Sequence, residues 1–185
     1  MTNKANKERL LIGCVGDRFM PGVKGSIAEA ALVCEEHGIH TEIKVQPPIT
    51  VMPYFGLATM RNRLCMAAVE DNFTHLALLD NDVLIEGSYA FRAMIQEDIG
   101  LQVPFLKQQF QKHIKLGDPE FEWDYGINRI KWAVLSCIMF QVDALRKLGP
   151  SVFLDTFCYC EEETMFQRWR LLGVDAYQNT DVSVT

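Results

Sequence analysis

The stretch Leu76-Ala77-Leu78-Leu79-Asp80-Asn81-Asp82 decides the fold class of this chain. An uninterrupted apolar run is typical of a strand buried on both faces of a parallel sheet, and ligands bind beyond the carboxyl ends of such strands. Because residues i and i+2 of a strand share a face, Asp80 and Asp82 are expected to converge on one point. Two carboxylates suit a hard cation such as Mg²⁺ or Mn²⁺, which commonly links a protein to substrate phosphates. The stretch therefore predicts a nucleotide-diphosphate site; alternatively, the aspartates only cap the following helix.

The overall composition favours one domain that spans residues 1–185. The chain has 185 residues, of which 49% are hydrophobic, which is enough for one core and too little for two. The net charge of −6 excludes a general attraction to nucleic acid or to an anionic membrane surface. No apolar segment follows the charged N-terminus, and no apolar run approaches the roughly 20 residues of a membrane span. We therefore expect a soluble, cytoplasmic protein.

The six cysteines indicate reduced thiols rather than disulfides. Most of them lie inside apolar segments, as core cysteines do. Only Cys158 and Cys160 are close in sequence, and such a pair without a second Cys or His pair is a poor signal for zinc.

Apolar strands alternate with amphipathic helices, which predicts an α/β fold with a mostly parallel central sheet flanked by helices. The predicted strands are Leu10–Val15, Ile39–Val45, Leu76–Leu79, Leu101–Phe105, Trp132–Val142 and Asp175–Gln178. The predicted helices are one that is capped by Ser26 and Glu29 and ends near His37, then Gly56–Glu70, Ser88–Gln96, a short one that Asp143 caps and that ends at Gly149, and Glu161–Leu172. Lys107–Ile130 shows no period, and such a long irregular stretch is typical of a functional loop or lid.

One helix carries a charge within its apolar stripe. Leu57 and Leu64 mark the buried face of the helix Gly56–Glu70, and Arg61 falls inside that face. A guanidinium is a rigid fork of donors that matches carboxylate or phosphate. Arg61 is therefore expected either to pair with a core carboxylate or to project into a pocket at the end of the sheet. Its neighbour Asn62 either caps a loop or contacts the ligand.

The last predicted helix begins with three glutamates, Glu161, Glu162 and Glu163. Negative charge in a first turn complements the helix dipole, and this is the simplest explanation of the cluster. By helical spacing, however, Glu162 lies within the apolar stripe and Glu163 lies well off it, so at least one carboxylate should point inward. A carboxylate beside apolar surface has a raised pKa, which suits a general base that deprotonates a hydroxyl nucleophile.

In their order and spacing these segments resemble the GT-A glycosyltransferases, especially family-2-like ones and small phage-type members. The resemblance extends from about Leu10 to the end of the chain. It rests on Arg61-Asn62, on Thr74 to Asp82, and on Glu162-Glu163-Thr164-Met165-Phe166-Gln167-Arg168 before Leu171-Leu172-Gly173. It implies a GT-A fold and transfer of a sugar from a nucleotide-diphosphate donor to an unidentified hydroxyl acceptor, with a UDP- or GDP-sugar as the expected donor.

The resemblance also implies roles for individual residues. Asp80 and Asp82 match the D-x-D motif that holds the divalent metal, Mn²⁺ or Mg²⁺, and the donor. Arg61 matches the arginine beside the diphosphate. Gly16 and Asp17 match the loop after the first strand, where the nucleoside lies.

Two departures from the family pattern bear on the chemistry. Glu162-Glu163 stands where the family has an E-D pair near the acceptor, the usual source of the base, and the longer second side chain leaves open which of the two acts. A histidine that usually follows the last strand and completes the metal shell has no counterpart before Thr185. Either the chain is truncated before that ligand, or Asp82, the diphosphate and water hold the metal.

Two other functions also fit the sequence. Leu78 to Leu84 matches the nucleophile strand of haloacid-dehalogenase-type phosphatases, in which Asp80 would attack phosphorus and Asp82 would act as acid. That family places this strand near its N-terminus, whereas two strand-helix units precede it here. The other alternative is a domain that binds a nucleotide sugar without catalysis.

Overall fold

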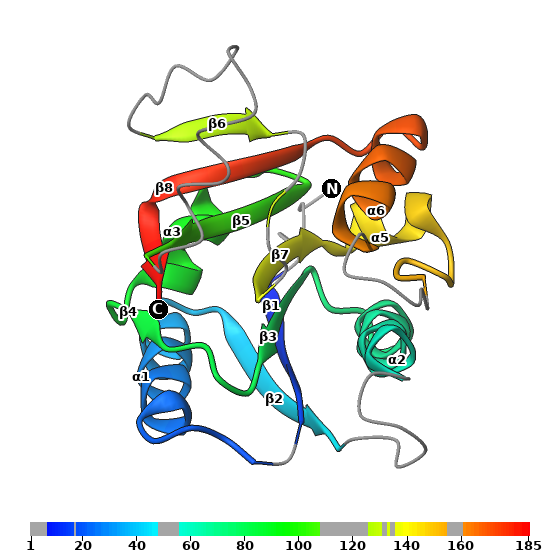
Figure 1. The fold of residues 1–185 in the computed structure, drawn as a ribbon. Helices are drawn as coiled ribbons and strands as arrows, with labels where there is room; N and C mark the ends of the chain where they lie inside the picture. Colours follow the sequence, from blue (N-terminus) through cyan, green and yellow to red (C-terminus); the bar gives the residue numbers. More distant parts are fainter. Residues whose placement is uncertain are drawn as a thin grey trace, which may run out of the picture.

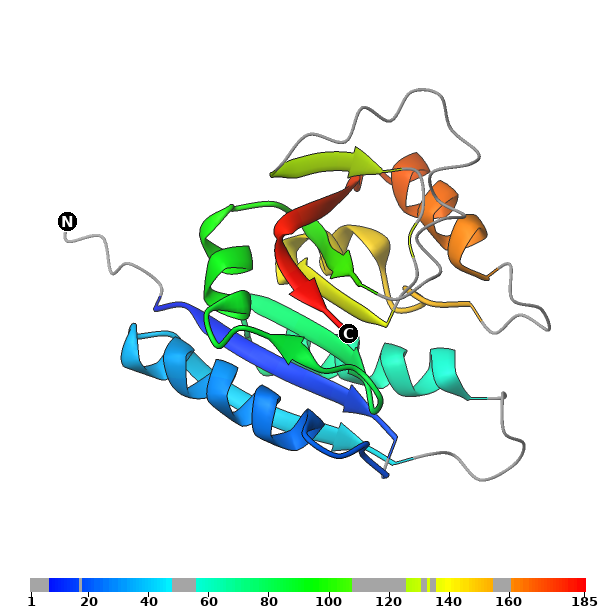
Figure 2. The same cartoon turned by 60° about the vertical axis from the view of Figure 1, so that its left-hand side comes forward.

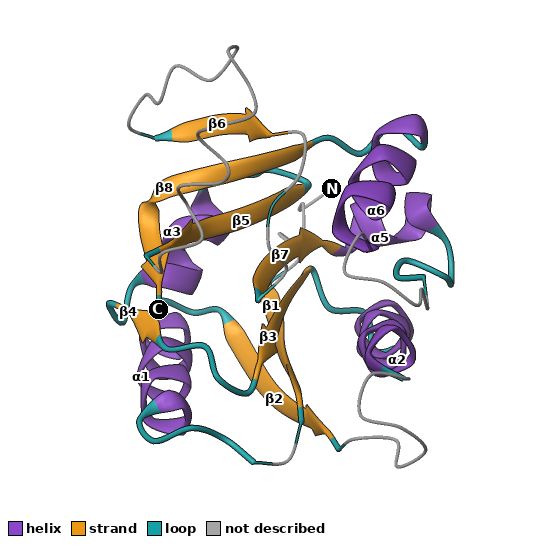
Figure 3. Ribbon diagram, in the orientation of Figure 1, coloured by secondary structure: helices purple, strands orange, loops and turns teal. Residues whose placement is uncertain are grey.

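The computed structural model describes residues 7–16, 18–47, 56–107, 126–130, 133, 136–154 and 161–185. In this part of the chain a central sheet lies between helices on both of its faces (Figures 1 and 3). The strands are β1 (Arg9–Val15), β2 (His40–Gln46), β3 (His75–Asp80), β4 (Ile85–Glu86), β5 (Leu101–Leu106), β6 (Ile127–Ile130), β7 (Cys137–Gln141) and β8 (Ala176–Val184). The helices are α1 (Val23–Glu36), α2 (Leu57–Glu70), α3 (Ala90–Gln96), α5 (Val142–Leu148) and α6 (Glu161–Leu171).

The strand order of the sheet is β2-β1-β3-β7-β5-β8-β4, and β6 pairs with β8 outside this path. β1 runs parallel to β2 and β3, and β5 runs parallel to β8, whereas β7 lies antiparallel between β3 and β5. Among the described residues, more pairs of residues face each other in parallel ladders than in antiparallel ones. The predicted α/β class with a mostly parallel sheet is confirmed. β1 and β3 therefore bring their carboxyl ends to the same edge of the sheet.

Two apolar layers hold the helices on the sheet. β1 and β3 point alternate side chains into each layer, and both strands are buried over nearly their whole length. Ile12 lies in the layer with α1 and α3, and Leu11 lies in the layer with α2, α5 and α6. At Gly13 a Cβ would lie 2.9 Å from Leu64 Cδ1, so α2 packs this closely on β1 because a side chain is missing there.

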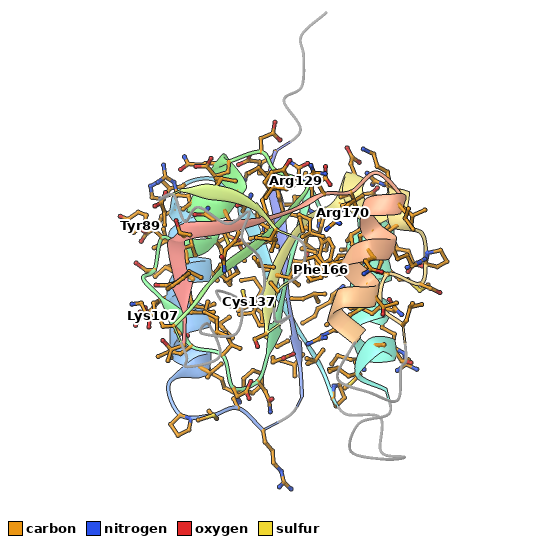
Figure 4. All side chains as sticks on the ribbon, turned by 45° about the horizontal axis from the view of Figure 1, so that its top comes forward. Tyr89, Lys107, Arg129, Cys137, Phe166 and Arg170 are labelled. Carbon is orange, nitrogen blue, oxygen red and sulfur yellow. The ribbon has the colours of Figure 1, made fainter. Side chains whose placement is uncertain are left out.

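An aromatic cluster anchors α6. The Trp169 ring is fully buried and meets the rings of Phe140 and Phe153 edge to face, with centroids 5.6 and 5.7 Å away. Its Nε1 donates a hydrogen bond to the carbonyl of Val152 at 2.9 Å. Phe166 points from α6 into the same cluster (Figure 4). In Figure 2 the first turns of α6 and α2 lie on the side of the molecule toward which β1 points.

Two predicted helix caps are wrong. α1 begins at Val23, so Ser26 lies inside the first turn instead of capping it. The Ser26 hydroxyl donates to the Val23 carbonyl at 3.0 Å and accepts from the Ile85 N–H at 3.2 Å, so it ties α1 to β4. α5 begins at Val142, which places Asp143 within the first turn rather than at the cap.

The second half of the sheet differs most from the sequence prediction. β7 begins only at Cys137, and β8 is longer than predicted. β6 occupies the end of the stretch Lys107–Ile130 that shows no sequence period, because pairing with β8 supplies the order that local pattern lacks. Residues 108–125, which hold most of the predicted loop, lie outside the described residues.

The four described cysteines, Cys14, Cys34, Cys65 and Cys137, are free and buried, as expected for reduced core thiols. Burial raises the pKa of the Cys14 and Cys34 thiols to about 11, which makes them poor nucleophiles. The predicted pair at positions 158 and 160 lies outside the described residues. None of the described helices combines the length and the apolar character that crossing a membrane requires.

Candidate active site

Asp80 is the last residue of β3 and the first residue of a turn. Its N–H donates to the Ser136 carbonyl at 3.0 Å, and the N–H of Val83 donates to the Asp80 carbonyl at 3.4 Å. Asp82 therefore lies in this turn and not on the strand, which corrects the expectation that the strand pleat aligns the two aspartates. The Asp82 side chain is exposed beyond the edge of the sheet.

Arg61 reaches Asp80 from the buried face of α2. Its Nη2 lies 2.9 Å from Oδ1 and 3.1 Å from Oδ2 of Asp80. The Arg61 side chain is 7% exposed and that of Asp80 is 25% exposed, so the pair is largely removed from water. The guanidinium also lies 5.5 Å from the centroid of the Phe153 ring. Of the two expectations for Arg61, the structure shows pairing with a carboxylate, and this carboxylate lies at the edge where ligands are expected.

The environment of Asp80 disfavours its negative charge. Burial raises the pKa of the Asp80 carboxyl, the Arg61 guanidinium opposes this shift, and the negative charge of Asp82 adds to it. The turn thus keeps the two aspartates close enough to repel each other. The charges described at this turn are two carboxylates and one buried guanidinium, which pairs with Asp80, and this local balance favours the approach of a cation.

Asn62 connects α2 to the segment after α5. Its Nδ2 donates to the carbonyl of Phe153, and its Oδ1 accepts from the N–H of Phe153, both at 2.8 Å. Of the two expectations for Asn62, the structure shows the contact with a loop. The paired bonds hold the Phe153 ring beside Arg61, so Asn62 supports the ion pair from the next position of the helix.

Asn81 ties the loop after β1 to the turn after β3. Its Nδ2 donates to the carbonyl of Arg18, and its own carbonyl accepts from the N–H of Met20 at 3.0 Å. Gly16 has φ +105°, and a Cβ there would lie 2.9 Å from Asn81 Cγ, so a glycine is needed where the loop passes this side chain. Asn81 is not among the predicted site residues, because between two aspartates it resembles a spacer and its contacts depend on the backbone of another segment.

The end of β8 closes the same region. Leu84 and Thr185 exchange backbone hydrogen bonds of 2.7 and 3.0 Å, which places Thr185 beside the residue two positions after Asp82. Glu86 pairs with Lys107 and accepts a hydrogen bond from the Thr185 hydroxyl. These contacts lower the pKa of Glu86 to about 2, with Lys107 as the largest cause. Lys107 lies at the margin of the molecule (Figure 4).

The remaining candidate residues are only partly described. α6 begins at Glu161, so Glu162 and Glu163 lie in its first turn as predicted. The side chains of both glutamates, and the whole of Asp17, lie outside the described residues, so their roles stay predictions. Among the side chains that are described, no group of three or more His, Cys, Asp or Glu residues gathers where a metal ion could bind.

Comparison with known proteins identifies the fold. No family model and no curated protein matches the sequence. A197 from STIV is similar in structure, with a TM-score of 0.59 and 16% identity over 95% of this chain and 84% of that one. A mutant Drosophila β-1,4-galactosyltransferase 7, in complex with manganese, UDP-Gal and xylobiose, has a TM-score of 0.60 and 14% identity over 93% of this chain and 65% of that one. GalNAc-T7 with UDP, GalNAc and Mn²⁺ has a TM-score of 0.59 and 10% identity, with 97% and 44% covered.

These similarities show that the chain has a GT-A-like fold, as the resemblance implied. The chain spans less than two thirds of the length of the galactosyltransferase and of GalNAc-T7. The similarity therefore establishes the fold.

Replacing Arg61 with methionine should destabilise the protein, because the Asp80 carboxylate then loses its partner while remaining largely buried. We expect a loss of about 2 to 4 kcal/mol in urea unfolding at pH 7. Without the guanidinium, nothing from Arg61 opposes the burial that raises the pKa of Asp80. As the pH falls, Asp80 of the folded variant takes up a proton and its unpaired charge disappears, so the loss of stability should shrink. Exposed Arg63 on the same helix is the matched control, and Arg63→Met should change stability by less than about 0.5 kcal/mol.

The double variant Arg61→Met with Asp80→Asn tests whether the two side chains act as a pair. Removing both charges should recover most of the loss of Arg61→Met alone. If the double variant is as unstable as the sum of the two single variants, the ion pair does not hold α2 on β3.

Replacing Gly16 with alanine should cost more stability than the same change at Gly38. Both glycines have positive φ, but a Cβ at Gly38 meets nothing within 4 Å, whereas one at Gly16 meets Asn81. We expect a loss of about 1 kcal/mol at Gly38 and about 2 to 3 kcal/mol at Gly16, measured by urea unfolding. Adding Asn81→Ala to Gly16→Ala should remove the clash between the new Cβ and Asn81, and should bring the loss at Gly16 closer to the loss at Gly38. Equal losses for the two single glycine variants would contradict the close approach of Asn81 to Gly16.

Proposed function

We propose that this chain transfers a glycosyl group from a nucleotide-diphosphate sugar to a hydroxyl acceptor, with Mn²⁺ or Mg²⁺ as cofactor. The observation that carries the proposal is the Arg61–Asp80 ion pair beside Asp82, at the carboxyl edge of a GT-A-like sheet. Open α/β sheets bind ligands at this edge. Galactosyltransferase 7 and GalNAc-T7, which share the fold, were solved with manganese and UDP-containing ligands.

The donor atoms of Asp80 and Asp82 fit a hard divalent cation. Both groups offer carboxylate oxygens. Burial is the main cause of the raised pKa of Asp80, and the charge of Asp82 adds to it, so a bound cation would offset the unfavourable negative charge. Asp80 is already engaged by Arg61, so Asp82 is the carboxylate better placed to hold the metal directly, with Asp80 beside it. The metal would neutralise charge that develops on the departing diphosphate.

Arg61 and the loop after β1 are proposed to position the donor. The Arg61 guanidinium brings positive charge to the sheet edge and can share it between Asp80 and the diphosphate. Asn81 holds the loop after Gly16 against the turn through Arg18 and Met20, and the nucleoside is proposed to lie there. Asp17 stays a predicted contact of the nucleoside. Asn62 supports this arrangement through Phe153 and is a further candidate for contact with the donor.

The acidic first turn of α6 is proposed to supply the general base. Buried Met165, Phe166 and Trp169 fix α6 on the sheet, and its first turn faces the same side as the carboxyl end of β1 (Figure 2). Glu163 is our first choice for the residue that removes the proton from the acceptor hydroxyl, and Glu162 is the alternative.

The contacts of Asp80 argue against the phosphatase alternative. A nucleophilic carboxylate needs an oxygen free to attack phosphorus, and both oxygens of Asp80 lie within hydrogen-bonding distance of Arg61 Nη2. The acidic cluster that follows begins a helix, α6, and does not end a strand. A domain that binds the donor without catalysis remains an outcome of the experiments below.

Calorimetric titration with UDP and with GDP should show metal-dependent binding. We expect affinity for one of the two to be at least about tenfold higher with Mn²⁺ than with EDTA. Asp82→Asn should remove most of this difference. Asp143→Asn is the matched control, because Asp143 is 82% exposed on α5 and lies away from the site. It comes just after β7, whose last residue pairs with the first residue of β3, whereas the site follows the last residue of β3. Equal affinities with Mn²⁺ and with EDTA for both nucleotides would contradict the proposal.

Glu163→Gln should lower the rate of sugar transfer and leave donor affinity unchanged. Loss of a general base typically lowers the rate by about 10² to 10⁴. Glu162→Gln is tested in parallel with the donor that calorimetry selects and a panel of hydroxyl acceptors. Donor binding without transfer by the parent chain would favour a binding domain, and transfer at the parent rate by both variants would exclude these glutamates. A phosphoenzyme that disappears in Asp80→Asn would favour the phosphatase.

A further inference from the structure

β2 forms an open edge of the sheet. It pairs with β1 on one side through seven consecutive residues, and no other strand of the described chain pairs with its outer side. Figure 2 shows β2 at the margin of the sheet with α1 across one face. The strand contains neither proline nor glycine, and its register with β1 has no bulge. Long, regular edges of this kind are templates for pairing with another strand.

The backbone groups that face outward can be assigned from the bonds to the first strand. The N–H of His40 donates to the carbonyl of Glu8, and the carbonyl of Gln46 accepts from the N–H of Gly16, so the even-numbered residues face β1. Successive residues of a strand alternate, so the N–H and C=O groups of 41, 43 and 45 point away from the sheet. A carboxylate of α1 already accepts one of these, the N–H of position 41.

The side chains of the edge fall into two rows. Ile43 pairs with Ile12 in the register, which places it on the α1 face together with Val45. Their exposed fractions are 48% and 47%, so α1 leaves both half uncovered. Glu42 and Lys44 lie on the opposite face, where Lys44 pairs with an aspartate at the end of α2.

We infer that this edge pairs with the same edge of a second copy of the chain. The two strands run antiparallel about a twofold axis at Ile43, which makes one continuous sheet through both copies. Ile43 then lies opposite Ile43 of the second copy, and Thr41 lies opposite Val45. Glu42 lies opposite Lys44 of the second copy, and the twofold axis forms this ion pair twice.

The two rows of side chains select the antiparallel direction, and charge favours this register. A parallel arrangement of the same two edges would turn the second copy over and set the apolar row of Ile43 and Val45 beside the charged row of that copy, which is unfavourable. Both side chains keep free surface in the single chain, with exposed fractions of 41% for Glu42 and 37% for Lys44. A lysine ammonium has three donors, so Lys44 can keep its bond to Asp71 and also bind Glu42 of the second copy.

Sedimentation velocity over a series of concentrations tests the dimer. The average mass of the parent should rise from the monomer value of 21.1 kDa toward twice that value. Ile43→Lys should weaken association by about tenfold or more, because it removes the central contact of the pair. Leu171→Lys is the control, since Leu171 is 88% exposed on α6, which packs in the other apolar layer, and it should dimerise like the parent.

A charge exchange tests the register. Glu42→Lys alone and Lys44→Glu alone should each be monomeric, because like charges then meet twice across the axis. Mixing the two variants should restore a one-to-one dimer, since every opposed pair is again of opposite sign. Melting temperatures of the separate variants confirm that each is folded. A parent that stays monomeric throughout, single variants that dimerise like the parent, or a mixture that does not associate would each overturn the inference.

Discussion

The ion pair between Arg61 and Asp80 is the interaction on which the geometry of the candidate site depends. A guanidinium within the apolar face of a helix is tolerable only with a carboxylate partner, because a buried charge without one is strongly destabilising. Asp80 supplies that partner from the last position of β3, so α2 and β3 are held in one relative position. The pair also brings charge of both signs to the edge where parallel strands end. The same two side chains thus neutralise a buried charge in the core and supply the charged groups of the site.

The rest of the edge is assembled from remote segments by main-chain bonds. Asn81 binds the loop after β1 through its amide and its carbonyl, and Leu84 pairs with Thr185 at the end of β8. The turn Asp80–Val83 is therefore held on one side by the loop after β1 and on the other side by the end of β8. Bonds of this kind fix the position of the backbone while leaving the exposed side chain of Asp82 unobstructed, which suits a site that binds a charged ligand.

The central strands and helices could be predicted from the sequence because their buried side chains form apolar patterns. Of the candidate site, only the residues that belong to such a pattern could be predicted with their structure. The apolar run Leu76–Leu79 and the stripe that contains Arg61 are local patterns, and both have the structure expected of them. The strand pleat is a local pattern and predicts that Asp82 shares a face with Asp80. The observed turn depends instead on the hydrogen bond from the Val83 N–H to the Asp80 carbonyl. β6 exists through its pairing with β8, so no pattern in its own residues announces it. The role of Asn81 depends on the positive φ of Gly16, sixty-five positions earlier, which no pattern around the aspartates contains.

The electrostatics of Asp80 connect stability to ligand binding. In the free chain its carboxylate is buried beside Asp82, and its raised pKa means that the charge is unfavourable there. A cation that binds only the folded chain would relieve this repulsion and stabilise the fold in proportion to its concentration over its dissociation constant. Neutralising Asp80 itself would leave Arg61 without this carboxylate. Under the proposed function, neutralising Asp82 would instead relieve the repulsion in the free fold and disfavour the donor complex. Stability and affinity oppose each other at this position, which is the compromise expected where a binding site is built into the edge of a core.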